Sequence, residues 1–415
     1  MNKDIKILRN LARELAEVAA QPEQTEKKRL WEKLNGLKPE RPMLVIDDIF
    51  ICWHELNIED ALTLRCEDHY FREIETQLRR LLYRNRYLKD DFVFEAAIYL
   101  PSTVRGLDFG LAVEEDTINL NEDKDAIKAH HYYDQLKTEE DLEKLKVPDF
   151  RVDEEETKKN KEMAEEAVGD YLEVVMDGVE IGHDAWDLLV QWRGFDNLLE
   201  DICDNPEFVY QTIEKSVDIK LAILDKLEEK NLLRKRPQRL VGSITTFTDE
   251  LPKTEDADLM HPKACDSFTY GMAQIMYLMS PEMYNELEIT FAKKWFSRFG
   301  MGYYGCCEPL DDRLEYVKQI PNVRKISASG FVKNYERFAE ELEGKYVMSF
   351  KPSPAMLVDG AWNPERVRTE LQKLLHAANQ YKAPCEFILK DLSTISSKPK
   401  RLFEWVGIAN EVLQR

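Results

Sequence analysis

The chain has 415 residues and a formal net charge of -21. Apolar residues make up 43% of it and aromatic residues 10%, which is enough for a sizeable core. The length fits one large α/β barrel with extensions, or two to three average domains. The negative charge argues against a nucleic-acid partner, because neutralising phosphates requires a basic face. No apolar run approaches the roughly 20 residues of a membrane span, which argues against a membrane protein.

The cellular compartment is predicted from the N-terminus and the cysteines. The first residues lead into an amphipathic segment with Glu14 and Glu17, unlike the apolar core of a signal peptide. Seven cysteines, an odd number, fit reduced thiols better than a disulfide framework. We therefore expect a cytoplasmic protein.

The N-terminal 88 residues predict a helical extension. Residues 1–35 have apolar side chains at helical spacing and predict a charged helix that caps the fold or contacts a second copy, so a homodimer is compatible with it. Residues 43–46 predict a short strand, and residues 60–88 a surface helix. The apolar run at 92–100, stopped by Pro101, predicts the first strand of a barrel that occupies residues 89–415.

The middle of the chain alternates between charged and apolar segments. Residues 114–165, rich in Asp, Glu and Lys, predict a solvated loop and helix rather than a recruiting surface. A strand is expected near 177–182, a helix from Asn205-Pro206 to about 230, and another strand at 240–246. We find no internal repeat and no Pro/Gly-rich linker, so one barrel is simpler than two domains.

Four segments in the C-terminal half each run into a polar or reactive residue. These segments, residues 299–305, 323–327, 345–350 and 386–390, are predicted to be neighbouring parallel strands, and each of the first three precedes a helical stretch. Repeated βα units predict a (β/α)8 barrel of the TIM type, in which the carboxyl ends of the strands meet at one mouth. We therefore expect the residues after these strands to face one cavity.

Cys306, Cys307 and Glu308 follow the first of these strands. Thiolates suit zinc, and a carboxylate can complete a site that keeps one position open for substrate. Adjacent cysteines could equally supply a nucleophile, or be small buried residues at a strand end. Cys306, Cys307 and Glu308 are therefore our candidate metal ligands.

Two lysines and an aspartate follow the later strands. Lys351 is a candidate substrate-binding residue, because a lysine at the closed end of a pocket can hold a carboxylate or phosphate. Lys390 and Asp391, with Glu308, are candidate catalytic residues that transfer protons. The alternative for Lys390 and Asp391 is an ion pair that only satisfies the barrel rim.

Two further residues are candidate substrate contacts. His183 follows the strand expected near 177–182 and could act as an acid, a base or a ligand, although a lone histidine is more often structural. Tyr304 could pack against a ligand, although aromatic residues in barrel strands usually belong to the core. His261 and Cys265 have helical metal-ligand spacing, which Pro262 between them weakens.

The segment 186–201, followed by Asp204-Asn205-Pro206-Glu207-Phe208-Val209, resembles the uroporphyrinogen decarboxylase superfamily. Ser280-Pro281-Glu282-Met283-Tyr284, followed by a strand that runs into a cysteine, is similar too. The resemblance covers roughly residues 90–410 and implies a single (β/α)8 barrel. The superfamily contains metal-free porphyrinogen decarboxylases and zinc methyltransferases that move a methyl group between a corrinoid protein and a thiol or tetrahydrofolate.

The chain departs from both branches. The arginine-rich motif of the decarboxylases is absent near residues 40–60. Where the methyltransferases carry His-x-Cys, this chain reads Gly305-Cys306-Cys307, so Cys307 takes the family cysteine and Cys306 replaces the histidine. The later family cysteine is replaced by Lys390-Asp391. A zinc ion would then have to take Glu308, or a more distant histidine or cysteine, as a further ligand.

The resemblance implies a methyltransferase, closer to the corrinoid-linked branch than to the decarboxylases. It would move a methyl group between a separate corrinoid protein and a thiol, amine or tetrahydrofolate acceptor, with zinc assisting. The alternative is a metal-free decarboxylase or lyase acting on a carboxylated substrate. A barrel that only binds a ligand or partner is a third reading.

Overall fold

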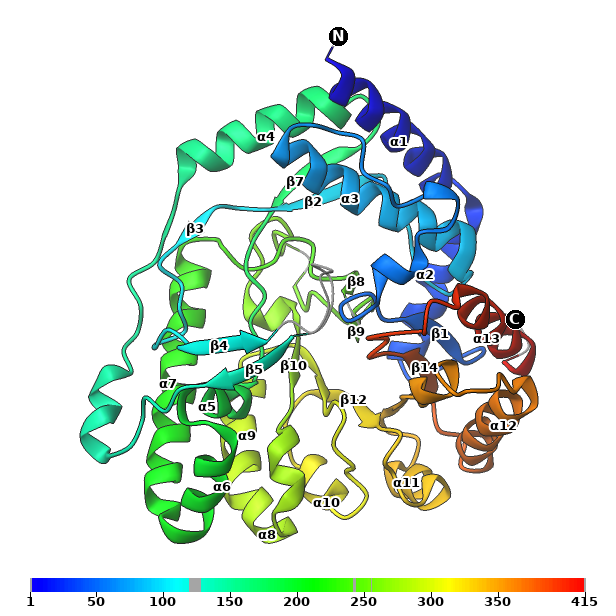
Figure 1. The fold of residues 1–415 in the computed structure, drawn as a ribbon. Helices are drawn as coiled ribbons and strands as arrows, with labels where there is room; N and C mark the ends of the chain where they lie inside the picture. The colour runs from blue at the N-terminus through cyan, green and yellow to red at the C-terminus, as the bar shows by residue number, and fades with distance from the viewer. Residues whose placement is uncertain (1, 119–127, 242–243, 255, 414–415) are drawn as a thin grey trace.

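The computed structural model describes residues 2–118, 128–241, 244–254 and 256–413. Its centre is a curled sheet of six parallel strands in the order β1-β14-β13-β12-β11-β10 (Figure 1). The strands are β1 (Met43–Ile46), β10 (Phe268–Gly271), β11 (Met301–Tyr304), β12 (Val323–Ala328), β13 (Val347–Phe350) and β14 (Cys385–Leu389). Helices cover the outer face of the sheet, as the apolar residues of both layers require.

The four C-terminal strands confirm their prediction. β11, β12, β13 and β14 are neighbours, and each adjacent pair is parallel. α10 (Leu314–Val317), α11 (Tyr335–Leu342) and α12 (Pro364–Gln380) follow the first three strands, as expected. The carboxyl ends of β11, β12, β13 and β14 therefore lie at one edge of the sheet.

A second parallel pair, β2 (Ala97–Pro101) and β7 (Glu173–Asp177), stands apart from this sheet. In the described part of the chain, the strands of the expected closed barrel hydrogen-bond as a group of six and a group of two. An isolated bridge between His183 and Gly271 links the segment after β7 to β10. The structure thus shows an α/β protein with a six-stranded curled sheet and N-terminal helices.

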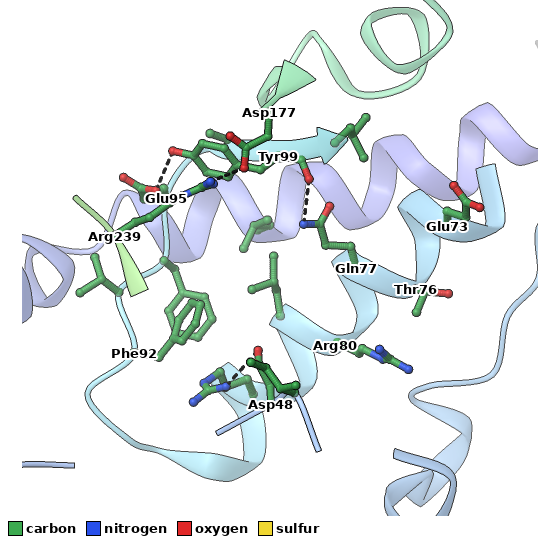
Figure 2. A pocket seen from close by; sticks show the side chains of 18 of the residues that line it. Asp48, Glu73, Thr76, Gln77, Arg80, Phe92, Glu95, Tyr99, Asp177 and Arg239 are labelled. Carbon is green, nitrogen blue, oxygen red and sulfur yellow. Dashed lines mark hydrogen bonds and ion pairs between the residues drawn. The ribbon is translucent and has the colours of Figure 1, made fainter. Parts of the chain in front are cut away.

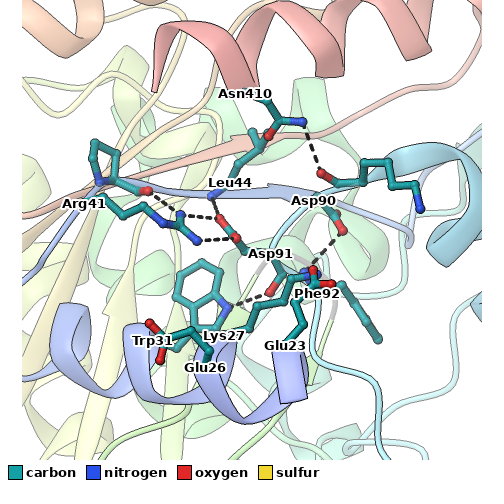
Figure 3. Close-up of polar contacts among 12 residues, drawn as sticks. Glu23, Glu26, Lys27, Trp31, Arg41, Leu44, Asp90, Asp91, Phe92 and Asn410 are labelled. Atoms are coloured by element: carbon teal, nitrogen blue, oxygen red, sulfur yellow. Dashed lines mark hydrogen bonds and ion pairs between the residues drawn. The ribbon is translucent and has the colours of Figure 1, made fainter. Parts of the chain in front are cut away.

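The segment before β2 covers the edge of β1 that faces away from β14, with two carboxylates and with the Asp91 N–H, which donates to the Leu44 carbonyl at 2.8 Å. The Leu44 N–H donates to Asp91 Oδ2 at 2.8 Å, and the Ile46 N–H donates to Asp90 Oδ2 at 2.9 Å. Arg41 holds Asp91 in an ion pair at 2.8 Å, which Figure 3 shows beside Leu44. These contacts satisfy the backbone groups at this edge of β1, while β2 begins at Ala97 and pairs with β7.

The boundary expected at residue 88 does not separate the sheet from the N-terminal segment. β1 lies within the first 88 residues, yet its four residues pair with β14 and are fully buried. The expected first helix is two helices, α1 (Lys3–Ala19) and α2 (Pro22–Asn35), and α3 (His69–Tyr83) follows. α1 packs on α3 and on α4 (Glu154–Val168), as Figure 1 shows.

The remaining elements include a short strand pair inside the curl of the sheet (Figure 1), where Thr245 Oγ1 accepts from Lys325 Nζ at 3.1 Å. The strand expected at 240–246 is an antiparallel pair, β8 (Leu240–Val241) with β9 (Ile244–Thr245), and residues 242–243 lie outside the described chain. Among the described helices, none is long and apolar enough to cross a membrane. The other strands and α-helices are β3 (Val104–Arg105), β4 (Glu115–Ile118), β5 (Ala129–Tyr132), β6 (Arg151–Val152), α5 (Ala185–Arg193), α6 (Phe195–Asp204), α7 (Pro206–Glu229), α8 (Pro281–Tyr284), α9 (Thr290–Phe296) and α13 (Pro399–Val412), and a π-helical turn (Asn285–Ile289) joins α8 to α9.

Candidate functional site

A cluster of two thiols, an ammonium and a carboxylate forms where β11 and β14 end. Lys390 Nζ lies 2.8 Å from Cys306 Sγ and 3.5 Å from Cys307 Sγ. Cys307 Sγ lies 3.4 Å from Asp391 Oδ2, and the two sulfurs are 3.7 Å apart. Four of the predicted site residues, 84 positions apart in the chain, thus meet in direct contact. We call Cys306, Cys307, Lys390 and Asp391 the thiol cluster.

Two unusual backbone conformations position the thiol cluster. Gly305 has a φ of +93°, and an added Cβ would lie 2.8 Å from Leu310 and 3.0 Å from Ser327. Only glycine fits there, and it turns the chain back over the end of β11. Asp391 adopts a left-handed conformation with a φ of +59°, directly after β14 and Lys390. Such conformations are uncommon for residues other than glycine and concentrate at functional sites.

Proximity shifts the protonation of the cluster. The hydrogen bond with the Cys307 thiol, helped by the Lys390 ammonium, lowers the pKa of Cys306 to about 6 although burial opposes it. The same hydrogen bond raises the pKa of Cys307. Burial would lower the pKa of Lys390, but the neighbouring thiols raise it. The arrangement favours one thiolate held by an ammonium, with the second thiol as hydrogen-bond donor.

Glu308 supports the loop of the thiol cluster from below. Its Oε2 accepts the N–H of Cys306 at 2.8 Å, and its Oε1 accepts the N–H of Ala273 at 3.2 Å. The residue is 2% exposed, and burial raises the pKa of its carboxyl to about 8. Both oxygens therefore face backbone amides rather than the sulfurs.

Lys351 belongs to a buried polar chain inside the sheet. Its Nζ donates to Ser349 Oγ at 2.6 Å, and Ser349 Oγ donates to Glu386 Oε1 at 2.7 Å. Glu386 also pairs with Lys325 at 2.7 Å. Burial lowers the pKa of Lys351 to about 7, and its Nζ lies 5.0 Å from the centre of the Tyr303 ring. Lys351 is thus enclosed beneath the mouth, with a hydroxyl as its hydrogen-bond acceptor.

His183 and Tyr304 meet at a different residue, Glu288. His183 Nε2 lies 3.1 Å from Glu288 Oε2, and the Tyr304 hydroxyl donates to Glu288 Oε1 at 2.8 Å. The Trp186 indole N–H also donates to this carboxylate, at 3.0 Å. His183, Glu288 and Tyr304 are 0% exposed. The structure gives both predicted substrate contacts a packing role, and their contact with substrate stays a prediction.

The donors that the sequence proposed for zinc do not fit a zinc ion in this arrangement. Among the described residues, no group of three or more His, Cys, Asp or Glu is placed to hold a metal. The positive charge beside the Cys306 sulfur comes from Lys390, and both oxygens of Glu308 are engaged by amides. His261 pairs with Asp258 at 2.7 Å and Cys265 precedes β10, at the opposite end of the sheet from Cys306.

The sequence reasoning missed Lys325, Ser349 and Glu386. A signal for them exists, because successive side chains of a strand alternate between its two faces. Residues 325 and 327, 349 and 351, and 386, 388 and 390 each share one face of their strands, and Lys325 and Glu386 place charges on that face. Charges at these inward-facing positions indicate a polar interior, which the residues that follow each strand do not reveal.

Comparison with known proteins is limited to structure. No model of a protein family matches the chain, and no curated protein matches its sequence. The fold is similar to that of a solved methyltransferase from Methanosarcina mazei, with a TM-score of 0.51. The two share 11% identity, and the match covers 92% of this chain and 97% of that chain. At this identity the match shows a shared fold.

Proposed function

We propose that the chain is a methyltransferase of the uroporphyrinogen decarboxylase superfamily, with a distorted (β/α)8 barrel. The supporting observations are the fold shared with a methyltransferase and the sequence resemblance. The single observation that carries the reaction centre is the contact of Lys390 Nζ with Cys306 Sγ at 2.8 Å, at the end of parallel strands. Reactive side chains in barrel enzymes collect at this end.

In the proposed reaction, Cys306 is the proton acceptor. Its sulfur takes the proton from an acceptor thiol or amine, or from a folate nitrogen, and Lys390 stabilises the charge on the sulfur beforehand. The freed lone pair of the acceptor attacks the methyl carbon, and the bond from that carbon to its donor breaks with its electron pair left on the donor. A corrinoid on a separate partner protein would supply the methyl group. We route no step through zinc, because the donors do not fit it.

A second candidate is a metal-free decarboxylase or lyase. It is favoured by the buried carboxyl of Glu308, whose pKa burial raises to about 8, and by Lys351, whose pKa burial lowers to about 7. Such groups can donate or accept protons near neutral pH. In this reading Lys390 and Lys351 hold substrate carboxylates, and Asp391 or Glu308 transfers the proton.

Methyl transfer is tested with methylcobalamin as a small stand-in for the corrinoid protein. A thiol, an amine and tetrahydrofolate are offered in turn, and methylated product is followed by mass spectrometry. We expect one acceptor to be methylated faster than in the uncatalysed reaction, and Cys306→Ser to lose this activity. Cys203→Ser, which changes an exposed cysteine outside the cluster, is the matched control and retains it.

Wild-type protein that methylates none of the three acceptors would count against this proposal. Carbon dioxide released from a carboxylated substrate, lost in Asp391→Asn, would instead support the decarboxylase.

A further inference from the structure

A cavity of about 660 Å³ lies beside the β2–β7 pair, between α3 and the segment that leads into β2. It is lined by α3, by the loop after β1, by β2 and by the last residue of β7, Asp177. We call it the seam cavity, and Figure 2 shows its side chains. Its volume is in the range of pockets that enclose small organic molecules, roughly 300 to 1,000 Å³. None of the four residues of the thiol cluster is among the described residues that line it.

The cavity starts beside the strand that carries Lys390. The Asp47 N–H donates to the Leu389 carbonyl at 2.9 Å, so β1 and β14 end together. The next residue, Asp48, lines the seam cavity. The cavity and the thiol cluster thus lie at neighbouring strand ends, while their walls are built from different residues.

Arg84 presents one guanidinium to two unequal carboxylates at one end of the cavity. The inner one, Asp90, is 2% exposed and lies 2.6 Å away. The outer one, Asp48, has a side chain that is 35% exposed and lies 3.4 Å away. Arg84 is itself 2% exposed, and its Nε and Nη1 have no hydrogen-bond partner. The outer position is therefore loosely filled, although a buried guanidinium gains most from close, charge-assisted hydrogen bonds.

Aromatic side chains form one part of the lining, among charged and aliphatic ones. Phe92 lies between the Asp48 end and a second guanidinium, Arg239, as Figure 2 shows. Arg239 stacks on the Tyr99 ring, 3.8 Å from its centre, and is held by Asp177. These flat surfaces suit a flat apolar body, since aromatic faces and guanidinium planes both stack on rings.

We propose that the seam cavity binds a small organic acid with an aromatic body. The ring would lie against Phe92 and the Tyr99–Arg239 stack. Its carboxylate would take the outer position on Arg84 while Asp48 turns to solvent, so the inner ion pair with Asp90 is kept. This site goes beyond the proposed methyl transfer and does not depend on it.

The test is calorimetric titration of the full chain with 2-naphthoate and with the uncharged 2-naphthamide. We expect naphthoate to bind about tenfold more tightly, the worth of one charge-assisted hydrogen bond. Asp48→Asn should tighten naphthoate binding further and leave naphthamide unchanged, because it removes the internal competitor for Arg84. This direction is the opposite of what loss of a fold-supporting residue would give.

A blocking variant shows where the probe binds. Thr76 faces the cavity from α3, so Thr76→Trp should fill the space and abolish naphthoate binding. His69→Trp adds the same side chain at an exposed position of the same helix outside the lining, and should bind as the wild type does. Equal affinity for the two probes, unchanged or weaker naphthoate binding in Asp48→Asn, or full binding in Thr76→Trp would each overturn the proposal. None of these outcomes bears on the proposed methyl transfer, which is tested separately.

Discussion

Two polar clusters involve β11 and differ in what encloses them. The thiol cluster follows the strand, and its cysteines are only partly buried. The Glu288 cluster includes Tyr304, the last residue of the strand, and its His183, Glu288 and Tyr304 are sealed at 0% exposure. Both contain residues that the sequence nominated for function.

The difference shows that a side chain's position relative to the strand end, more than its residue type, decides whether it is sealed in the core or partly exposed at the mouth. Tyr304 still follows the alternation of β11 and contacts Tyr284 and Glu288 in the covering helices. Cys306 comes after the turn at Gly305, outside the strand, so the alternation of β11 does not set the direction of its side chain. We therefore expect substitutions in the thiol cluster to lower activity with little change in stability. Substitutions in the Glu288 cluster should lower the stability of the fold.

The largest expected effect is on activity at the thiol cluster. Cys306→Ser should lower the rate of methyl transfer about 1,000-fold, within the usual range for loss of a proton-transferring group. Lys390→Met should lower it too, because it removes the charge that stabilises the Cys306 thiolate. The free energy of unfolding should change by about 1 kcal/mol or less, because the core contacts remain. Rates and urea unfolding, measured on the same preparations, test this. Variants that lose stability and activity together would make the cluster structural.

The next effect is on stability at the Glu288 cluster. Glu288→Ala leaves the side chains of His183, Trp186 and Tyr304 buried without their acceptor, which should cost about 3 kcal/mol or more of unfolding free energy. Glu286→Ala, at an exposed position of the same helical turn, is the control and should change it by about 0.5 kcal/mol or less. Equal unfolding curves for the two variants would show that the Glu288 contacts add nothing.

The sequence predicted the four C-terminal strands because each is a short apolar run followed by a helix. It also predicted that the residues of the thiol cluster lie close together, since residues after neighbouring parallel strands meet at one edge. It could not predict which neighbours satisfy each polar group. The capping of β1 by Asp90 and Asp91, and the pairing of His183 with Glu288 across 105 positions, are long-range contacts without a local pattern.

A pH effect distinguishes the polar chain beneath the mouth from the thiol cluster above it. Folding lowers the pKa of Lys351 from 10.5 to about 7, so between these values the unfolded chain binds a proton that the folded protein does not. The unfolding free energy therefore rises with pH across this window. Below pH 7 the folded protein bears the full cost of burying the charged Lys351 ammonium. The unfolding free energy of the wild type relative to Lys351→Met should increase by up to about 1.4 kcal/mol per pH unit from pH 7 upward.

Lys333→Met provides the control for that comparison, because Lys333 is an exposed lysine in the loop after β12. Its difference from the wild type should stay flat over the same range. A flat difference for Lys351→Met as well would mean that Lys351 stays charged in the folded protein.

The smallest expected effect concerns metal. The sequence predicts a zinc ion on Cys306, Cys307 and Glu308, whereas the structure places the Lys390 ammonium 2.8 Å from the Cys306 sulfur and turns Glu308 toward backbone amides. An ammonium and a zinc ion cannot share this position, so treatment with a chelator should change neither the melting temperature nor the rate of methyl transfer. Elemental analysis of the protein, purified without a histidine tag, accompanies both measurements. If one zinc per chain is found and its removal abolishes activity, Lys390 must swing away from the thiols on metal binding. In that case Lys390→Met would bind zinc more tightly than the wild type, because the competing cation is gone.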